Sequence, residues 1–197
     1  NAGPGVYMEL HFTQSGTAPE TMIKKGKLVF KGQNTAGYTA EIRSGSFTVH
    51  GGAEIDVNSP TSSGMILDAG TWLKTRDSSN TAARVWGNVT LYGNLEIDGT
   101  DSCGRLTISG DVVMSGTYWA TIDFGTQNYD KLVVLGDLCL GGTLGIWREG
   151  QLNLNQLFNI ILVSGQRGGE FTQVDMNGDN YTILYDNGNA NGVDIKT

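Results

Sequence analysis

Apolar and polar residues alternate in short runs along most of this chain, and glycines separate the runs. The clearest example begins at Gly136, after which apolar residues stand at 138, 140, 144 and 146, with Gly142 between the two pairs. Side chains of a strand alternate between its two faces, so each pair predicts a short strand with one buried face. The glycines mark corners, where a sharp turn needs positive φ or a close approach of two backbones.

The same arrangement recurs upstream, in repeats that begin at glycines 26, 45, 64, 87 and 110. A repeat of roughly 20 to 25 residues is typical of a solenoid, in which each repeat forms one turn of a coil. At Gly64 the apolar positions shift by one residue, which predicts a β-bulge, because without it that face would turn outward. The expected fold is therefore an all-β, parallel β-helix (β-solenoid). A β-sandwich, which also has short strands and many turns, stays open as the alternative.

Stacked turns lie about 4.8 Å apart and bring like residues into columns. The inward positions around Gly136 should therefore be buried between the turns before and after them. The core residues expected there are Val134, Leu138, Leu140, Leu144 and Ile146.

Composition agrees with one soluble β-rich domain. The chain has 29 Gly and only 3 Pro in 197 residues, and a formal net charge of −7. Such a charge argues against a nucleic-acid partner, which would require a basic stripe. No apolar run is long enough for a membrane span, so none is expected.

Several features favour a secreted protein. The sequence begins without an initiator Met, which suggests a processed chain or a fragment, and Asn88 and Asn180 lie in sequons that permit glycosylation. Cys103 and Cys139 form an even pair, as disulfides in an oxidising compartment require. Cys139, however, alternates with inward residues and should face outward, so a disulfide between the two stays open and unpaired thiols are favoured.

The last 80 residues or so resemble the C-terminal end of autotransporter passengers and related bacterial secreted β-helix proteins. The matching segments, in order, are YWATI at 118–122, YDKLVVLG at 129–136, LCLGGTL at 138–144, FNIILV at 158–163, GEF at 169–171, YTILY at 181–185 and GVDI at 192–195. The resemblance implies an extracellular, single-stranded, right-handed β-helix that ends in a β-hairpin cap, without enzymatic activity. Nothing like a membrane barrel follows Thr197 here, so autotransport itself is not expected.

We therefore expect a single domain over residues 1–197, with an N-terminal strand and loop at 1–20, β-helix turns at 21–165 and a C-terminal β cap at 166–197. The N-terminal strand is expected at 6–12 and lies outside the repeat. The apolar residues that share one of its faces are Val6, Met8, Leu10 and Phe12.

Catalytic signals are poor. The two histidines, His11 and His50, lie in no Ser, Cys or metal motif. A polysaccharide-cleaving β-helix enzyme would need clustered carboxylates, but aspartates are also common in turns without any catalytic role. The candidate carboxylates for such an enzyme are Asp98, Asp101, Asp123 and Asp130. We expect no catalytic residue, no cofactor and no enzymatic activity.

Asp175, Asn177 and Asp179 place oxygen atoms at alternate positions, as calcium loops do. The sixth position is Asn180 instead of Gly and the twelfth is Asp186 instead of Glu, so an EF-hand is excluded. A plain turn explains the segment, and no metal ligand is expected.

The tryptophans are the remaining residues that suggest a site. Trp86, Trp119 and Trp147 alternate with inward aliphatic residues and should face outward, and Trp72 is the fourth. Outward aromatic rings can stack on sugars or pack against a neighbouring subunit, and cover by loops is an equal alternative.

Two functions follow as hypotheses. The first is an extracellular structural or adhesive β-solenoid, located at the cell surface, that self-associates into a filament or surface layer because a coil leaves strand edges open at its ends. In that case the strand at 6–12 can add to a neighbour's edge. The second is a carbohydrate-binding module that takes surface glycans on its outward aromatic rings.

Overall fold

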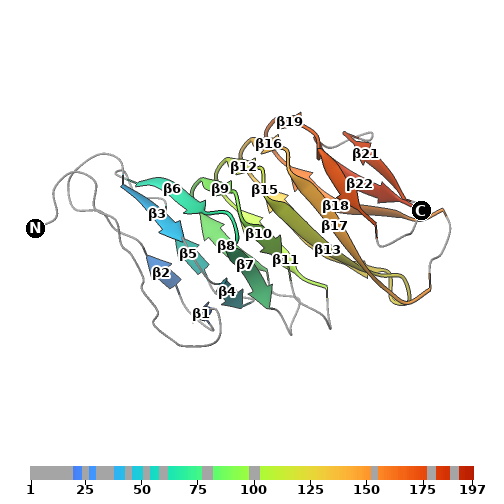
Figure 1. The fold of residues 1–197 in the computed structure, drawn as a ribbon, viewed down its shortest axis with the longest axis horizontal. Helices are drawn as coiled ribbons and strands as arrows, with labels where there is room; N and C mark the ends of the chain where they lie inside the picture. The colour runs from blue at the N-terminus through green and yellow to red at the C-terminus, as the bar shows by residue number, and fades with distance from the viewer. Residues whose placement is uncertain are drawn as a thin grey trace, which may run out of the picture.

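The structure, a computed structural model, describes residues 20–23, 27–29, 38–42, 46–50, 54–57, 62–76, 82–97, 103–151, 155–176, 181–186 and 191–197. The described residues form strands and turns, with no helix among them. The chain visits three sheets in rotation, and nearly every strand pairs in parallel with the equivalent strand of the next turn. The fold is thus a parallel β-solenoid, whose strands follow one another along the long axis in Figure 1.

We call the three sheets A, B and C. Sheet A contains, in order, β1 (Glu20–Ile23), β4 (Ser46–His50), β7 (Trp72–Arg76), β10 (Asn94–Glu96), β13 (Thr117–Asp123), β17 (Thr143–Glu149) and β20 (Gln173–Asp175), with β14 (Asn128–Tyr129) beside β13. Sheet B contains β2 (Lys27–Val29), β5 (Glu54–Asp56), β8 (Ala83–Trp86), β11 (Arg105–Ile108), β15 (Lys131–Val134), β18 (Leu157–Val163), β22 (Asn191–Lys196) and β21 (Thr182–Tyr185). Sheet C contains β3 (Tyr38–Ile42), β6 (Ser62–Leu67), β9 (Val89–Leu91), β12 (Val112–Met114), β16 (Leu138–Leu140) and β19 (Arg167–Gly169). Apart from β14, the strands from β6 to β18 make four successive turns, each with one strand in every sheet.

The core is one continuous cluster of apolar side chains inside the coil. All five residues predicted around Gly136 are buried, which confirms the inward positions of that repeat. The stacking is direct, because the strand registers place equivalent residues of successive turns side by side. In sheet C the resulting column is Met65, Val89, Val112 and Leu138.

Glycines occupy corners where no side chain fits. A Cβ on Gly116 would lie 1.8 Å from the carbonyl oxygen of Gly93 on the previous turn. Gly142, at the same corner one turn later, has φ +67 and would place a Cβ 2.0 Å from the oxygen of Gly116. Close approach and positive φ are therefore both present, as the sequence pattern predicts.

The predicted bulge at Gly64 is also present. The pairing of β3 with β6 shifts register at this point, since Tyr38 pairs with Ser62 but Thr39 pairs with Gly64. Gly64 has φ +117, which a side chain would strain. The extra residue, Ser63, restores the inward phase of Met65 and Leu67, both of which are buried.

A polar ladder, which the sequence reasoning did not anticipate, runs along one corner of the coil. The side-chain oxygen of Asn88 accepts a hydrogen bond from the N–H of Asp111 at 2.9 Å. Asp111 accepts in the same way from the N–H of Asp137 at 2.9 Å, and Asp137 from the N–H of Gln166 at 2.8 Å. Each of these residues directly follows a glycine. The ladder satisfies backbone donors that the corner would otherwise leave unpaired.

At the C-terminal end the pattern changes from parallel to antiparallel. β22 pairs antiparallel with β18, and β21 pairs antiparallel with β22. β19 and β20, which also belong to residues 166–197, instead pair in parallel with β16 and β17 and so continue the coil. Arg167 of β19 joins the two parts through an ion pair with Asp186. That β21 and β22 act as a cap stays a prediction.

Candidate functional site

Asp130, one of the four carboxylates considered for catalysis, is fully buried. Its two carboxylate oxygens accept hydrogen bonds from the backbone N–H of Gly104, at 2.8 Å, and from that of Thr121, at 2.7 Å. The side chain thus ties the entry of β11 and the strand β13 to the start of β15. Both oxygens accept hydrogen bonds from the backbone, so Asp130 has the contacts of a structural residue and not those of a catalytic acid or base.

Asp123 stabilises the turn that follows β13. One of its oxygens accepts from the N–H groups of Gly125, at 2.8 Å, and Thr126, at 3.3 Å, while the other accepts from the Thr126 hydroxyl. The bond from that hydroxyl is the largest influence that lowers the pKa of Asp123 below its usual value. A general acid requires the opposite shift, so this carboxylate suits a turn better than catalysis. Asp98 and Asp101 lie outside the described residues.

The two cysteines are unpaired. Cys139 is exposed on the outer side of sheet C, as its alternation predicts, whereas Cys103 is half-buried at the entry to β11. Burial, and then the nearby charge of Asp130, raises the pKa of the Cys103 thiol from 9.0 to about 12. A thiol that stays protonated is a poor nucleophile, so Cys103 is not an activated cysteine.

Trp119 and Trp147 form an aromatic pair on the outer side of sheet A. Their ring centroids are 5.7 Å apart at an interplanar angle of 71°. Trp119 stands beside Gly145 in the strand register, and a Cβ on Gly145 would lie 2.2 Å from the Trp119 ring. Gly145 thus leaves space for that ring, and Trp147 beside it is 50% exposed. The prediction that these residues face outward is confirmed most clearly for Trp147.

The other two tryptophans are half-buried and lie beside cations. The ammonium of Lys74 is 4.7 Å from the centroid of the Trp72 ring and also forms an ion pair with Glu96 at 2.9 Å. Trp86 lies in sheet B, where the guanidinium of Arg84 is 5.9 Å from the centroid of its ring and its indole N–H donates to Glu54 at 3.1 Å. The four tryptophans therefore form no single platform, and only Trp119 and Trp147 contact one another across successive turns.

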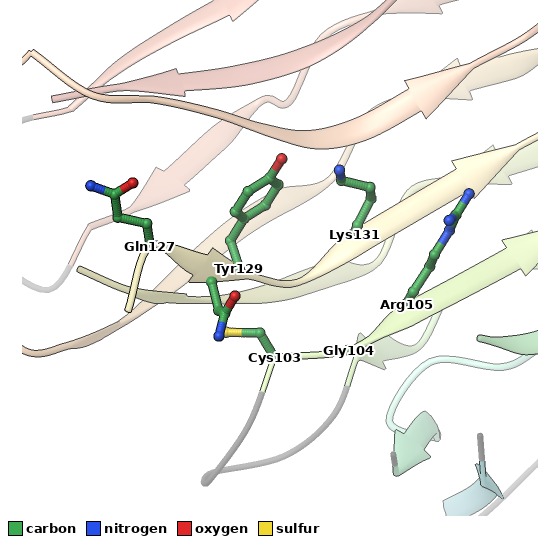
Figure 2. Close-up of a pocket in the computed structure, with 7 residues that line it drawn as sticks. Cys103, Gly104, Arg105, Gln127, Tyr129 and Lys131 are labelled. Carbon is green, nitrogen blue, oxygen red and sulfur yellow. The ribbon is translucent and has the colours of Figure 1, made fainter. Parts of the chain in front are cut away.

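A pocket that the sequence reasoning missed opens beside the entry to β11. Its volume is about 320 Å³, and its lining residues are Cys103, Gly104, Arg105, Gln127, Asn128, Tyr129 and Lys131. Figure 2 shows the side chains of Gln127, Tyr129, Lys131 and Arg105 rising on the same side of the strands. Arg105 and Lys131 are direct neighbours in the register of β11 and β15. The pocket thus combines two cations, an aromatic ring and two amides.

The structure does not place the remaining sequence candidates, which are the calcium-loop residues, the histidines and the sequon asparagines, in a binding or catalytic site. Asp175 is exposed in β20, while Asn177 and Asp179 lie outside the described residues. Within the part of the chain that the structure describes, no group of three or more His, Cys, Asp or Glu residues could hold a metal ion. His50 ends β4, but its side chain is not among those described, and His11 lies outside the described residues, as does Asn180. Asn88 is exposed and takes part in the polar ladder.

Comparison of the sequence with models of known protein families and with curated proteins finds no match. Among the described residues, none belongs to a helix that has the length and apolar character needed to cross a membrane.

Proposed function

We propose that this chain is an extracellular structural or adhesive β-solenoid that self-associates end to end. One observation carries the proposal: among the described strands, sheets A and C end in the parallel strands β20 and β19, each with a strand on one side only. Such edges present unpaired backbone groups on which a strand of another chain can add.

The edge at β20 supports the proposal in detail. The N–H of Gln173 donates to the oxygen of Gly142 on the previous turn, at 3.2 Å. Successive N–H groups of a strand point to opposite sides, so the N–H of Val174 points away from β17, toward the place of the next strand. The Val174 side chain is 36% exposed, although the equivalent residue of β17, Leu144, is fully buried. An added strand and its turn would complete this burial.

The added strand, in this proposal, comes from residues 6–12 of a second copy. Its shared apolar face, formed by Val6, Met8, Leu10 and Phe12, suits a half-buried position on the end of a coil. These residues lie outside the described part of the chain, so their role rests on the sequence pattern. The resemblance to autotransporter passengers and the two sequons support the extracellular, cell-surface location.

Sedimentation velocity of the full chain, measured over a wide concentration range, tests self-association. Val174→Pro removes the outward N–H but no ladder hydrogen bond, so it should weaken association at least tenfold. Val174→Ala keeps that N–H and is the matched control, and its association should be closer to that of the unchanged chain than the association of Val174→Pro is. A single monomer boundary at every concentration, or equal association of both variants, would refute the edge mechanism.

Deletion of residues 1–14 tests the donated strand separately. If the strand adds to a neighbour, the deletion should abolish association and leave the melting temperature of the dilute monomer unchanged. If association persists and the monomer melts earlier, the strand only caps its own coil.

Carbohydrate binding on Trp119 and Trp147 is the second candidate function. It is favoured by the exposed ring of Trp147 and by the support that Trp119 gives it on the neighbouring strand. Sugar rings stack on such aromatic faces. Polysaccharides should change the tryptophan fluorescence of the unchanged chain and of a Tyr92→Ala control, in which an exposed aromatic residue elsewhere is removed. Loss of the response in Trp147→Ala would support this site, and no response to any polysaccharide would remove it.

A further inference from the structure

We propose that the pocket beside β11 binds a carboxylate-bearing sugar residue of an acidic polysaccharide, with Arg105 and Lys131 as the carboxylate ligands. The site is separate from the strand edges and from the Trp119–Trp147 pair, so the inference does not depend on either proposed function.

The charge of the pocket is unusual for this chain. Its formal net charge is −7, yet two cations stand side by side on adjacent strands at this point. Within the described ranges, neither Arg105 nor Lys131 forms an ion pair, unlike Lys74, which pairs with Glu96, and Arg167, which pairs with Asp186. Like charges directly opposite one another in a sheet are unfavourable. A bound carboxylate would relieve that repulsion, and the planar guanidinium of Arg105 can hold both of its oxygens.

The nearest carboxylate in the sequence, that of Asp130, does not line the pocket and is bound by backbone groups. It is fully buried and accepts from the N–H groups of Gly104 and Thr121. The bond from Gly104 joins the residue before Arg105 to the residue before Lys131, and the bond from Thr121 ties both to β13. The two cations therefore project from a rigid base, which lowers the entropy lost when a ligand binds.

The aromatic ring in the pocket is also fixed. Tyr129 packs against Phe158 with the ring centroids 5.5 Å apart at 74°, and the ammonium of Lys131 lies 4.7 Å from the centroid of the Tyr129 ring. In Figure 2 Tyr129 stands between Gln127 and Lys131, so ring, amide and cations lie in one row.

This row matches a sugar acid better than a simple anion or an acidic peptide. The amides of Gln127 and Asn128 can donate to and accept from hydroxyl groups, which a carboxylate alone or a run of acidic side chains does not supply. Ligand pockets span roughly 300 to 1,000 Å³. The 320 Å³ of this pocket suits one or two sugar rings.

Isothermal titration of the full chain tests the site, with a glucuronate disaccharide as the probe and its methyl ester as the uncharged comparison. We expect the acid to bind and the ester to bind at least tenfold more weakly. Arg105→Gln and Lys131→Gln should each weaken binding of the acid at least tenfold. Arg84→Gln is the matched control, because Arg84 is an exposed cation of the same sheet outside the pocket, and it should bind normally.

Four outcomes would overturn the proposal: no binding of the acid, equal binding of the ester, equal loss in Arg84→Gln, or tighter binding of a glutamate peptide than of the sugar acid. Circular dichroism of each variant shows that it is folded. Val174→Pro and Trp147→Ala should keep the affinity for the sugar acid, so failure of either proposed function is distinguishable from failure of this site.

Discussion

Truncation of Leu138 to Ala tests the stacked core most sharply. Leu138 is 1% exposed and lies beside Val112 of the previous turn, so its side chain fills space between turns. Removal of its three outer carbons loses about 2 kcal/mol of transfer free energy. The cavity left in a rigid coil adds to this, and buried Leu→Ala changes destabilise by about 2 to 5 kcal/mol in total. For a chain of this size, each kcal/mol lowers the melting temperature by about 2 to 4 °C.

Cys139→Ala is the matched control, because Cys139 is the next residue of the same strand and faces outward. Its effect should stay within about 0.5 kcal/mol, as is usual for an exposed position. Thermal and urea unfolding, followed by circular dichroism, measure both variants. Small and equal effects at the two positions would show that Leu138 does not point into the core, and the assignment of inward and outward faces would fail.

Three further predictions follow from the structure. Gly116→Ala should destabilise the chain by about 1 to 3 kcal/mol in urea unfolding, because a Cβ cannot fit there. Gly168→Ala is the control, since its Cβ would meet nothing within 4 Å, and it should change the stability little. Equal effects of the two substitutions would contradict the close backbone contact at Gly116. Iodoacetamide at pH 8, followed by mass spectrometry, should label the exposed Cys139 well before Cys103, and faster labelling of Cys103 would refute its burial. The free energy of unfolding should fall as the pH rises from 9 toward 12, because the Cys103 thiol ionises in the unfolded state before it does so in the folded state. The pKa of Asp123 is lower in the folded state than in the unfolded state, where it is near 3.9. The carboxylate therefore stabilises the folded state above the unfolded pKa, and this stabilisation is lost as the pH falls through the folded pKa. The melting temperature should therefore fall less on acidification below pH 4 in Asp123→Ala than in the unchanged chain, and identical pH profiles would count against the turn bonds.

The sequence predicts the inward positions well, because burial of one strand face imposes a period of two, which the described residues of the repeats at Gly45, Gly87, Gly110 and Gly136 keep. Glycine corners are equally readable, since backbone contact at Gly116 and Gly142 excludes any side chain. The bulge at Gly64 follows from the same logic, because one extra residue is what returns the apolar phase to the core.

The repeat also predicts features of the outer surface. Gly110 and Gly136 start successive repeats 26 residues apart, and the same interval relates Arg105 to Lys131 and Trp119 to Gly145. The strand registers contain both of these pairs. Alignment of the repeats on their glycines would therefore have indicated the paired cations and the space beside the Trp119 ring.

Other features depend on contacts that no repeat encodes. Tyr129 reaches the pocket through β14, which folds back antiparallel on β13 and has no counterpart in the earlier described turns. The hydrogen bonds of Asp130 join three separate segments, and its burial depends on all of them. Such arrangements arise from insertions between repeats, where periodicity carries no information.

Negative-stain electron microscopy of the full chain across a concentration series shows whether the chain self-associates end to end. We expect rods that lengthen with concentration along the coil axis and that shorten to single particles in Val174→Pro. Single particles of monomer size at every concentration, or rods that are unchanged in Val174→Pro, would contradict it.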